Sequence, residues 1–462
     1  MRTNAYDIAV IGGGPSGVPA ALQAAQLGAR TLLVEKNAGL GGTTTSANVA
    51  FPGLFHAWGE QVIAGIGWEL VCRAVELSGD ALPDFRDDER PHWQRQVRVN
   101  APLYGALLLE EVHRSGLDLR LHTMPASAHW TGELWELRLC GKDGIEPVTA
   151  RRLVDCTGDA DVIGLAGLER RRNQDRQPGT IDIRLSGYDV DALDHDELDR
   201  GHTEAVRSGA LLASDLGSRG RPLLPFLAKR GENAIHLVGI EGATSEGRTA
   251  GELAGAAAVL RIYRFLRTLP GLENLRLDFR APEVGVRESV TITARTTVTG
   301  EDYLAGRVWA DSVCNSFYPI DIHRPDGNGI DKTHLRHGVV PTVPRDAMVP
   351  AGNPYAVVAG RCVGSDQAAN SALRVQATAM ATGQAAGALA AMSADLGGGR
   401  HRRTDDRPAP GARTLRGDRA RASRASRVIV RRGVRCCRPG KSLSSGRAGR
   451  IRSPQGGVVA QR

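Results

Sequence analysis

A glycine-rich segment near the start of the chain has the residue types and spacing that bind a dinucleotide. Gly12, Gly14 and Gly17, with an alanine four residues further on, fit the pattern G-x-G-x-x-G-x-x-x-A. The first glycine permits a tight turn, the second lets backbone approach a pyrophosphate, and the third lets a helix pack closely on a strand. Pro15 and Ser16 complete the turn. The pyrophosphate would then lie at the N-terminus of the next helix, where free N–H groups and the helix dipole favour negative charge.

An acidic residue follows this motif at the distance expected for a ribose contact. Glu35 lies 18 residues beyond Gly17, directly after the apolar run 31–34. A carboxylate in this place accepts hydrogen bonds from ribose hydroxyls, and the alternative is a solvated carboxylate at the end of a strand. Strand, glycines, helix, second strand and acid occur in order, which indicates a dinucleotide-binding βαβ unit. The motif serves both NAD and FAD.

Three further segments resemble the flavin-binding motifs of the glutathione-reductase-like superfamily. Segment 36–45 has a second glycine pair followed by threonines, and segment 155–159, Asp-Cys-Thr-Gly-Asp, is similar to the A-T-G motif at a strand end. Segment 359–366 resembles the C-terminal flavin motif, whose aspartate contacts the ribityl and pyrophosphate region. The resemblance implies FAD rather than NAD as the cofactor. The further cofactor-binding residues that it implies are Lys36, Gly41, Gly42, Thr43, Thr44, Thr157, Gly158, Asp159, Gly360, Arg361, Asp366, Asn370 and Leu373.

Residues from about 5 to 393 resemble the FAD-dependent oxidoreductase family that is related to the fumarate reductase and succinate dehydrogenase flavoproteins. The segments that carry this resemblance are 41–45, 284–289, 318–323 and 369–378. The N-terminal motif is shared by very many enzymes, whereas the last three segments are narrower. Many members are uncharacterised, so the resemblance specifies the cofactor better than the substrate.

Arg287, His323 and Arg374 are the candidates for proton transfer and substrate binding, because each lies in one of the narrower segments. An arginine binds a carboxylate through two parallel hydrogen bonds, and the related fumarate reductases are understood to use one as a proton donor. A histidine has a near-neutral pKa suited to acid–base chemistry. Each residue also has a structural alternative. Arg287 could pair with Glu283 or Glu288, Arg374 could bind flavin or backbone carbonyls, and His323 could be a structural histidine.

Two absences narrow the class of enzyme. No second G-x-G-x-x-G occurs between residues 160 and 395, and the seven cysteines include no C-x-x-C pair. Disulfide reductases with a separate NAD(P) domain and zinc ribbons are therefore disfavoured, and no metal site is predicted. The electron partner would be a substrate, a docking protein, oxygen, or a nicotinamide bound without its own Rossmann unit. His56 follows the second glycine pair, but its surroundings match a covalent flavin-attachment motif poorly.

The elements that position these residues alternate between strand and helix at first. Apolar runs at 6–11 and 31–34 flank a helix over 16–28, which predicts parallel strands with a helical crossover. Further strands are predicted at 117–122, 134–139, 150–155, 180–185, 234–240 and 355–359. Further helices are predicted at 59–77, 102–114, 191–208, 248–269 and 370–392. The last of these should point its N-terminus at the pyrimidine edge of the flavin.

The fold class predicted from this order is α/β, with a Rossmann-like, glutathione-reductase-like FAD-binding domain and an inserted α+β substrate or cap domain. The FAD-binding domain would comprise 1–165 and 341–395, and the cap domain 166–340. Residues 396–462 form an Arg-rich tail, interpreted as disordered or as the product of a reading-frame shift. A basic arm that binds nucleic acid is the third interpretation of this tail.

Charge and hydrophobicity limit the possible partners. The chain has a formal net charge of +8, but residues 400–462 hold 18 Arg and one Lys against three Asp. The remaining 40 basic and 48 acidic residues form an acidic body, so nucleic acid is expected to bind only through the tail. No apolar run approaches the ~18 residues of a membrane span, and no signal peptide is evident, so a cytoplasmic location is expected.

The function predicted from the sequence is hydride transfer between a small organic substrate and FAD. One alternative is a flavin-dependent protein that modifies or binds RNA, which only the basic tail supports. The other alternative is a flavin-binding remnant without catalytic activity, which a damaged gene would produce.

Overall fold

A seven-stranded sheet carries the N-terminal glycine motif in the computed structural model, which describes residues 4–87, 90–216, 221–327 and 329–394. Strand β1 (Ala5–Ile11) lies between β2 (Thr31–Val34) and β8 (Gly144–Asp155) and runs parallel to both. The order along the sheet is β5-β2-β1-β8-β7-β6, with β19 paired in parallel to the end of β8. The other sheet strands are β5 (Asp118–Arg120), β6 (Met124–Trp130), β7 (Trp135–Gly141) and β19 (Ala356–Val358).

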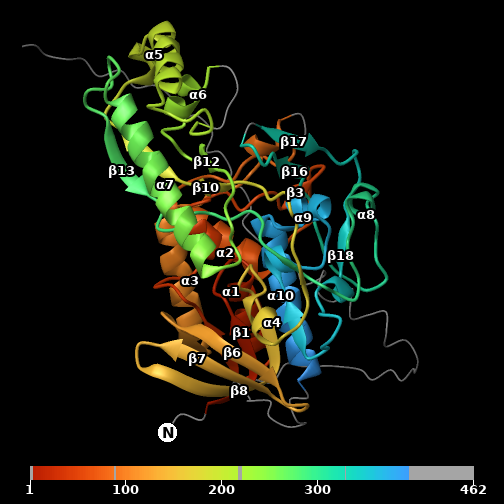
Figure 1. Cartoon of the computed structure of the whole chain (residues 1–462). Coiled ribbons are helices and arrows are strands. Elements are labelled where there is room, and N and C mark those ends of the chain that lie inside the picture. The colour runs from red at the N-terminus through yellow and green to blue at the C-terminus, as the bar shows by residue number, and fades with distance from the viewer. Residues whose placement is uncertain (1–3, 88–89, 217–220, 328, 395–462) are drawn as a thin grey trace, which may run out of the picture. The chain divides into compact units, whose positions relative to one another are not determined.

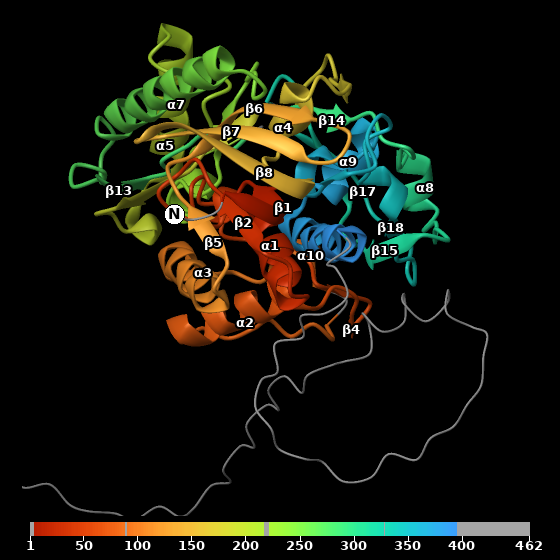
Figure 2. The same cartoon turned by 90° about the horizontal axis from the view of Figure 1, so that it is seen from below.

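Helices cover the face of this sheet that lies below it in Figure 2. They are α1 (Gly17–Gln26), α2 (Ile66–Ser78), α3 (Ala101–Ser115) and α10 (Gln376–Ser393). Helix α1 packs directly on α10. A Cβ atom on Gly383 would lie 2.0 Å from the carbonyl oxygen of Ser16, and one on Gly387 would lie 2.1 Å from that of Ala20. Glycine at these two positions therefore sets the distance between the two helices.

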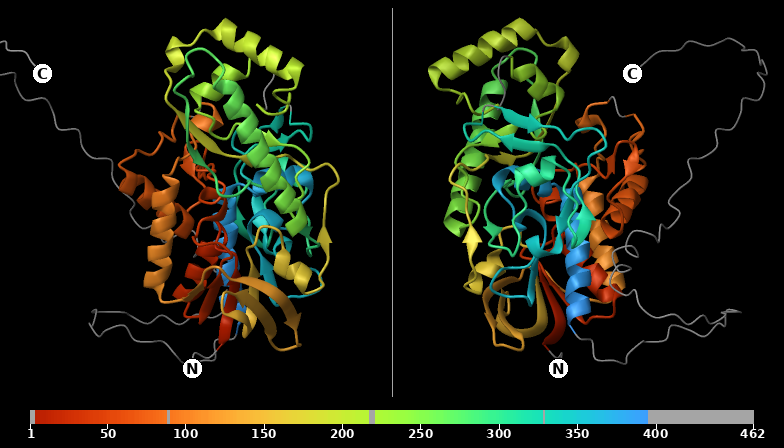
Figure 3. Two further views of the ribbon diagram at one scale, coloured as in Figure 1. Left: turned by 60° about the vertical axis from the view of Figure 1, so that its left-hand side comes forward. Right: turned by 90° about the vertical axis from the view of Figure 1, so that its right-hand side faces the viewer.

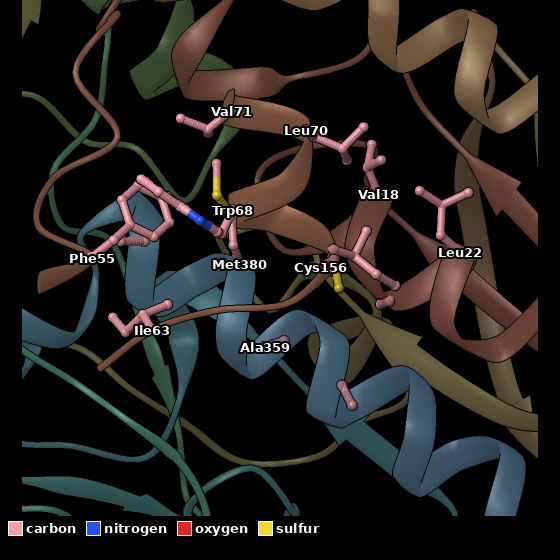
Figure 4. Packing of buried hydrophobic residues seen from close by; sticks show 14 of the residues in the cluster. Val18, Leu22, Phe55, Ile63, Trp68, Leu70, Val71, Cys156, Ala359 and Met380 are labelled. Atoms are coloured by element: carbon pink, nitrogen blue, oxygen red, sulfur yellow. The ribbon is translucent and has the colours of Figure 1, made fainter. Parts of the chain in front are cut away.

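Figure 4 shows the apolar core under these helices, where Val18 of α1, Trp68 of α2 and Met380 of α10 meet. The parallel strands are apolar on both faces because they are covered on both sides. A separate apolar core is formed by buried residues between 181 and 284, and Figure 1 shows that α5, α6 and α7 lie around it. All described residues belong to one compact unit. The predicted division at 165/166 and 340/341 stays a prediction.

The remaining elements are short apart from α5 and α7. The helices are α4 (Asp161–Leu165), α5 (His195–Ser208), α6 (Leu223–Ala228), α7 (Ser245–Leu266), α8 (Gly300–Leu304) and α9 (Gln367–Leu373). The strands are β3 (His56–Ala57), β4 (Glu60–Gln61), β9 (Arg170–Arg171), β10 (Gly179–Ile181), β11 (Ile183–Ser186), β12 (Ile235–Leu237), β13 (Arg276–Arg280), β14 (Thr291–Ile292), β15 (Ser312–Asn315), β16 (Ile320–His323), β17 (Ile330–Thr333) and β18 (Thr342–Pro344). Single 3-10 turns lie at Gly42–Thr44, His92–Gln94, Val190–Ala192, Arg345–Ala347 and Gly360–Cys362.

The helix predicted over 370–392 is wrong as a single element, because the structure divides it into α9 and α10. Val375 has an extended backbone, with φ −62° and ψ 141°, and α10 begins at Gln376. The N–H of Ala377 donates to the carbonyl oxygen of Pro52 at 2.7 Å. This tertiary contact overrides the helical propensity of the segment. The N-terminus expected to face the flavin is therefore the start of α10, at Gln376.

Smaller differences have local causes. The helix predicted over 59–77 begins only at Ile66, because residues 60–61 pair with 56–57 as a short hairpin. Strand β6 was not predicted, since its apolar and polar residues alternate weakly and its pairing partner is β7. The predicted tail 396–462 lies outside the described residues. Among the helices that are described, none has the length and apolar composition needed to cross a membrane.

Candidate functional site

The glycine motif lies in the loop between β1 and α1, and its glycines meet different surroundings. Gly12 has a positive φ of 100°, and a Cβ atom there would lie 2.4 Å from the carbonyl oxygen of Cys156. A Cβ atom on Gly17 would lie 1.7 Å from the carbonyl oxygen of Gly12. At Gly14 the nearest atom is the Cα of Gly42 at 3.9 Å, so the space beside Gly14 is open. A pyrophosphate fits this space, and a side chain on Gly14 would fill it.

The second glycine pair lies against the first. The N–H of Gly41 donates to the carbonyl oxygen of Gly13 at 2.8 Å. The hydroxyl of Thr44 is buried and donates to the side-chain oxygen of Gln376, the first residue of α10. The carbonyl oxygen of Thr43 accepts from the N–H of Val49 at 3.0 Å. The loop after β2 is thereby joined to the start of the long helix.

Pro15 and Ser16, the remaining residues of the first motif, lie close to Gly42 and Gly360. A Cβ atom placed on Gly42 would lie 3.5 Å from Cδ of Pro15. Ser16 is buried, and a Cβ atom placed on Gly360 would lie 2.9 Å from its hydroxyl oxygen. The backbone of Gly360 has a positive φ of 81°, and its N–H donates to the hydroxyl of Thr382 at 3.1 Å. Three distant segments therefore meet at the N-terminal end of α1.

Glu35 is buried at the end of β2. Its two carboxylate oxygens accept from the N–H groups of Gly13 at 2.6 Å and Asn37 at 2.9 Å. Burial raises the pKa of Glu35, although both backbone hydrogen bonds oppose the shift. Each oxygen retains a lone pair that a ribose hydroxyl can use. Lys36 forms an ion pair with Glu283, and its ammonium nitrogen lies 3.7 Å from a carboxylate oxygen of that residue.

The residues of the segment after β8 form hydrogen bonds mainly with other residues of the chain. Thr157 donates its N–H and hydroxyl to one carboxylate oxygen of Asp155, at 3.0 and 2.7 Å. Asp159 accepts from Arg361 and, at 2.6 Å, from Arg248. Burial raises the pKa of Asp159, but Arg361 and Arg248 outweigh it and hold the pKa below its ordinary value. Arg361 also donates to the carbonyl oxygen of Gly158 at 2.7 Å.

The C-terminal flavin-like segment leads into α9. Asp366 caps this helix by accepting from the N–H of Ala369 at 2.8 Å, and its other oxygen accepts from the N–H of Gly300 at 2.9 Å. Asn370 donates its amide to the carbonyl oxygen of Arg361 at 2.8 Å. Leu373 is buried. These residues fix the path of the chain towards Arg374, and their predicted contacts with FAD stay predictions.

The three residues predicted to be catalytic lie in one buried cluster with Asp321 and Gln177, called here the Arg–His cluster. The guanidinium of Arg374 donates to the backbone carbonyl of Asp321 at 3.2 Å and to the side-chain oxygen of Gln177 at 3.3 Å. The Nε2 atom of His323 lies 3.7 Å from a carboxylate oxygen of Asp321. Arg287 donates to the carbonyl oxygen of Pro178 at 2.7 Å, which comes directly after Gln177.

The two glutamates that could pair with Arg287, Glu283 and Glu288, bind other residues. Glu288 is buried and accepts from the side-chain amides of Gln177 at 3.1 Å and Gln367 at 3.0 Å. Glu283 accepts from Asn37 at 2.7 Å, beside Lys36. The structure therefore gives Arg287 a backbone carbonyl as its hydrogen-bond partner.

The charges of the Arg–His cluster do not cancel. Burial, together with the neighbouring Arg374, lowers the pKa of Arg287 to about 9. Burial lowers the pKa of His323 to about 4, although the nearby carboxylate of Asp321 opposes this. Burial raises the pKa of Asp321, but His323 and Arg374 outweigh it and hold the pKa at about 2. At neutral pH the cluster thus contains two cations, one carboxylate and a neutral imidazole.

Several buried polar atoms of this cluster have no hydrogen-bond partner among the described residues. They are Nε of Arg374, Oδ1 of Asp321 and Nδ1 of His323. A buried polar atom without a partner is costly, and a bound ligand is one way to satisfy it. A guanidinium N–H without a partner fits an anionic ligand such as a carboxylate, and the buried carboxylate of Glu288, bound to Gln177, already offsets part of the positive charge here.

The cluster is joined directly to the loops that bear the glycine motifs. Arg374 ends α9, and Gln376, two residues later, accepts from Thr44 and donates to the carbonyl oxygen of Val49 at 2.7 Å. The start of α10 thus lies between the cofactor-binding loops and the cluster. Three residues here were not predicted. Asp321 and Gln376 lie within segments that carry the family resemblance, whereas Gln177 has no signal in the sequence.

Metal binding is not evident in the described ranges, where no group of three or more His, Cys, Asp or Glu side chains is placed to hold an ion. His56 is stacked on Phe85, with ring centroids 3.8 Å apart. Burial lowers the pKa of His56 to about 4. This histidine therefore belongs to an aromatic group beneath α2.

The chain is similar to several curated flavoproteins over limited stretches. It is 49% identical to dihydrolipoyl dehydrogenase of Trypanosoma brucei brucei over 55 residues, 12% of each chain. It is 34% identical to the mitochondrial dihydrolipoyl dehydrogenase of Dictyostelium discoideum over 91 residues, 19% of each chain. It is 26% identical to thiamine thiazole synthase of Methanococcus vannielii over 175 residues, 37% of this chain and 61% of that protein. The chain therefore matches less than two thirds of the length of each of these relatives.

Two solved structures give more distant likenesses. A geranylgeranyl bacteriochlorophyll reductase-like protein of Thermoplasma acidophilum aligns with 84% of this chain and 78% of its own, at 13% identity and a TM-score of 0.41. The OxyS anhydrotetracycline hydroxylase of Streptomyces rimosus aligns with 42% of this chain and 41% of its own, at 20% identity and a TM-score of 0.30. At such scores neither likeness establishes a shared fold over the whole chain.

A family model described as FAD dependent oxidoreductase matches residues 7–399. This range contains the glycine motifs, Glu35, the start of α10 and the Arg–His cluster. The match confirms the family and the cofactor predicted from the sequence. The open space beside Gly14 and the buried carboxylate of Glu35 fit the pyrophosphate and ribose of that cofactor. The chain belongs to the FAD dependent oxidoreductase family, and its cofactor is FAD.

Proposed function

We propose that the protein oxidises or reduces a small organic molecule that carries a carboxylate, by hydride transfer between this molecule and flavin. The observation that carries the proposal is the Arg–His cluster, in which two partly buried arginines lie near the buried carboxylate of Asp321, and three buried polar atoms lack partners among the described residues. When bound, FAD supplies two-electron redox chemistry.

Arg287 and Arg374 bind the carboxylate of the substrate. A carboxylate bound to Arg287 and Arg374 would interact favourably with both positive charges, which lowers the cost of removing the two guanidinium groups from water. Arg374 has an N–H without a partner, so a carboxylate oxygen can accept from it without breaking an existing hydrogen bond. Gln177 orients the site, because its side-chain oxygen accepts from both Arg374 and the backbone of His323.

His323 is the proton-transfer residue of the proposal. Its pKa of about 4 leaves the imidazole neutral at pH 7, with Nδ1 free of partners in the described structure. A neutral imidazole accepts a proton from a substrate hydroxyl, amine or carbon acid. Asp321 lies 3.7 Å from the other ring nitrogen and stabilises the imidazolium that results. In the opposite direction of the reaction the same imidazolium donates the proton.

The substrate and the adenine half of the cofactor are proposed to bind in different parts of the site. Glu35, Gly14 and Gly42 lie at the carboxyl ends of β1 and β2, where they would hold the ribose and pyrophosphate. The redox-active half of the cofactor would lie towards Gln376, whose side chain is already fixed by two hydrogen bonds. In this proposal the Arg–His cluster lies near the redox-active half of the cofactor.

The test is anaerobic reduction of the purified flavoprotein by a panel of small carboxylic acids with an oxidisable hydroxyl, amine or C–C bond. Each acid is paired with its methyl ester or amide, which lack the negative charge. Bleaching of the flavin band by an acid, but not by its uncharged partner, is the expected result. If uncharged compounds reduce the flavin as fast as the acids, the carboxylate assignment is wrong. Reoxidation of the reduced protein is tested with the corresponding unsaturated or oxo acids, since the reaction can run in either direction.

A further inference from the structure

Helix α7 carries an exposed apolar seam on the side opposite to its buried face. Leu253 is 68% exposed and Leu260 is 49% exposed, although both lie in a helix of 22 residues whose other face is well packed. Ala250 and Ala257 are exposed between them. Positions 250, 253, 257 and 260 alternate in steps of three and four residues, which is the a/d pattern of a coiled coil. The left-hand view of Figure 3 shows α7, in green, running along the outside of the described structure.

A residue of opposite charge lies at each end of this seam. Glu246 lies one step before Ala250, and Arg264 lies one step after Leu260. Both side chains are exposed, and neither forms an ion pair within the described parts of the chain. A helix face exposed only to water would be expected to carry charged residues throughout. Here the charges are confined to the two ends, and the middle is apolar.

We propose that a second copy of this chain docks on α7, with the two helices antiparallel. In this arrangement Leu253 packs on the partner's Ala257, and Leu260 packs on the partner's Ala250. Glu246 then meets the partner's Arg264, and the two-fold axis repeats each of these contacts once. Every apolar layer pairs a large side chain with a small one, which lets the helices approach closely.

A parallel arrangement is disfavoured by the same residues. It would place Glu246 opposite Glu246 and Arg264 opposite Arg264, and like charges at such positions are destabilising. It would also stack leucine on leucine and alanine on alanine, which leaves gaps at the alanine layers. The seam is therefore complementary to itself only when one helix is reversed.

The surroundings of the seam permit the approach of a partner. The positions beside the N-terminal half of the seam are small, namely Gly247, Thr249, Ala254 and Ala256, whereas Arg261 and Tyr263 flank Leu260. Leu277 of β13 is 38% exposed and lines a hollow together with Leu260, with the charged residues Arg267, Glu273 and Arg276 around them. A contiguous exposed apolar patch of this kind on a folded protein marks an interaction surface.

The test is sedimentation equilibrium of the purified full-length protein with FAD bound, over the micromolar range. The wild-type protein is expected to dimerise, and Leu253→Glu and Leu260→Glu should each raise the dimer dissociation constant at least about tenfold, because each places a charge in an apolar layer. Leu77→Glu is the matched control, since Leu77 is 58% exposed on α2, away from the seam. Flavin absorbance and melting temperature establish that each variant is folded.

Charge reversal tests the antiparallel register separately and alters only exposed side chains. Glu246→Arg and Arg264→Glu should each weaken dimerisation, and the double variant should restore it. A wild-type protein that stays monomeric over the whole concentration range overturns the proposal. So does a dimer that Leu253→Glu and Leu260→Glu leave as tight as the wild type. A double variant no tighter than the two single variants overturns the antiparallel register.

Discussion

The glycines of the cofactor-binding loop have two different functions at the scale of single residues. Gly12 and Gly17 are required by the protein itself, because a Cβ atom at either position would meet backbone at 2.4 or 1.7 Å. Gly14 is not, since its nearest neighbour would be 3.9 Å from a Cβ atom. A motif read from sequence does not separate these requirements. The structure does, because it shows which glycine faces the chain and which faces open space.

Gly14→Ala should therefore leave the apoprotein as stable as the wild type and should weaken FAD binding at least about tenfold, because the methyl group takes the space of the pyrophosphate. Flavin content after reconstitution and the melting temperature of the apoprotein are the two measurements. Gly17→Ala is the contrasting variant and should destabilise the apoprotein itself. Tight FAD binding by Gly14→Ala would place the pyrophosphate elsewhere.

The residues of the Arg–His cluster are expected to affect turnover rather than cofactor binding. His323→Ala, Arg287→Ala and Arg374→Ala should retain FAD and slow substrate-dependent flavin reduction by about 10²-fold or more for a proton-transfer residue. The control is Arg324→Ala, because Arg324 follows His323 directly but is exposed and paired with Asp331. Loss of FAD in one of the three variants would assign that residue to cofactor binding, and normal turnover in all three would place the active site elsewhere.

At the scale of elements, the position of α10 decides how the site is assembled. This helix packs on α1 along Gly383 and Gly387, and its first residue joins the loop after β2 through Thr44. The break at Val375 turns the chain so that Arg374 enters the cluster while Gln376 starts the helix. A continuous helix through 370–392 would direct these two side chains along one regular spiral. The break therefore belongs to the site.

Gly383→Ala should destabilise the protein by about 1–3 kcal/mol, the usual cost of overpacking a tight interface, because its methyl group would lie 2.0 Å from a carbonyl oxygen of α1. Chemical denaturation measures this change in the free energy of unfolding. Gly39→Ala is the control, since no atom lies within 4 Å of the Cβ position at Gly39. Equal stabilities of the two variants would show that α1 and α10 can move apart at little cost.

At the scale of the whole molecule, four histidines are partly or fully buried and remain neutral at pH 7. Burial lowers the pKa of His56, His92 and His323 to about 4 and that of His236 to about 3. A histidine in the unfolded chain has a pKa of about 6.5. Between these values the unfolded state binds more protons than the folded state, so stability falls as the pH falls. The contributions of the four histidines to this pH dependence have the same sign, so they add.

These histidines should therefore lower the free energy of unfolding as the pH falls from about 6.5 to about 4, whereas Asp161 and Asp182, whose pKa values burial raises to about 6, act in the opposite direction over part of this range. His323→Gln should reduce the slope in this window, because it removes one of the contributing groups. His129→Gln, at an exposed position, is the matched control. Equal pH dependence of the wild type and His323→Gln between these pH values would contradict the neutral state of His323 in the folded protein.

The sequence by itself determined the parts of this protein that depend on local geometry. Glycine spacing, a short apolar strand and a terminal acid specify a βαβ unit within about thirty residues, because backbone conformation and helix packing there require those residue types. Strands β1 and β2 follow from this unit. The motif serves both NAD and FAD, so the cofactor and the family were indicated by the resemblance of other segments. The helix lengths were predicted less well, since Val375 and residues 60–61 adopt their conformations through distant partners.

Only the tertiary structure decided which distant residues share a site. Arg287, His323 and Arg374 were chosen as separate candidates, and the fold places them around Asp321 and Gln177. Spacing in the sequence cannot show this, because the contacts join segments whose approach depends on the packing of the whole chain. The charge of the cluster and the pKa values of its members are likewise properties of burial. The seam on α7 became visible only once the structure showed which face of that helix is covered.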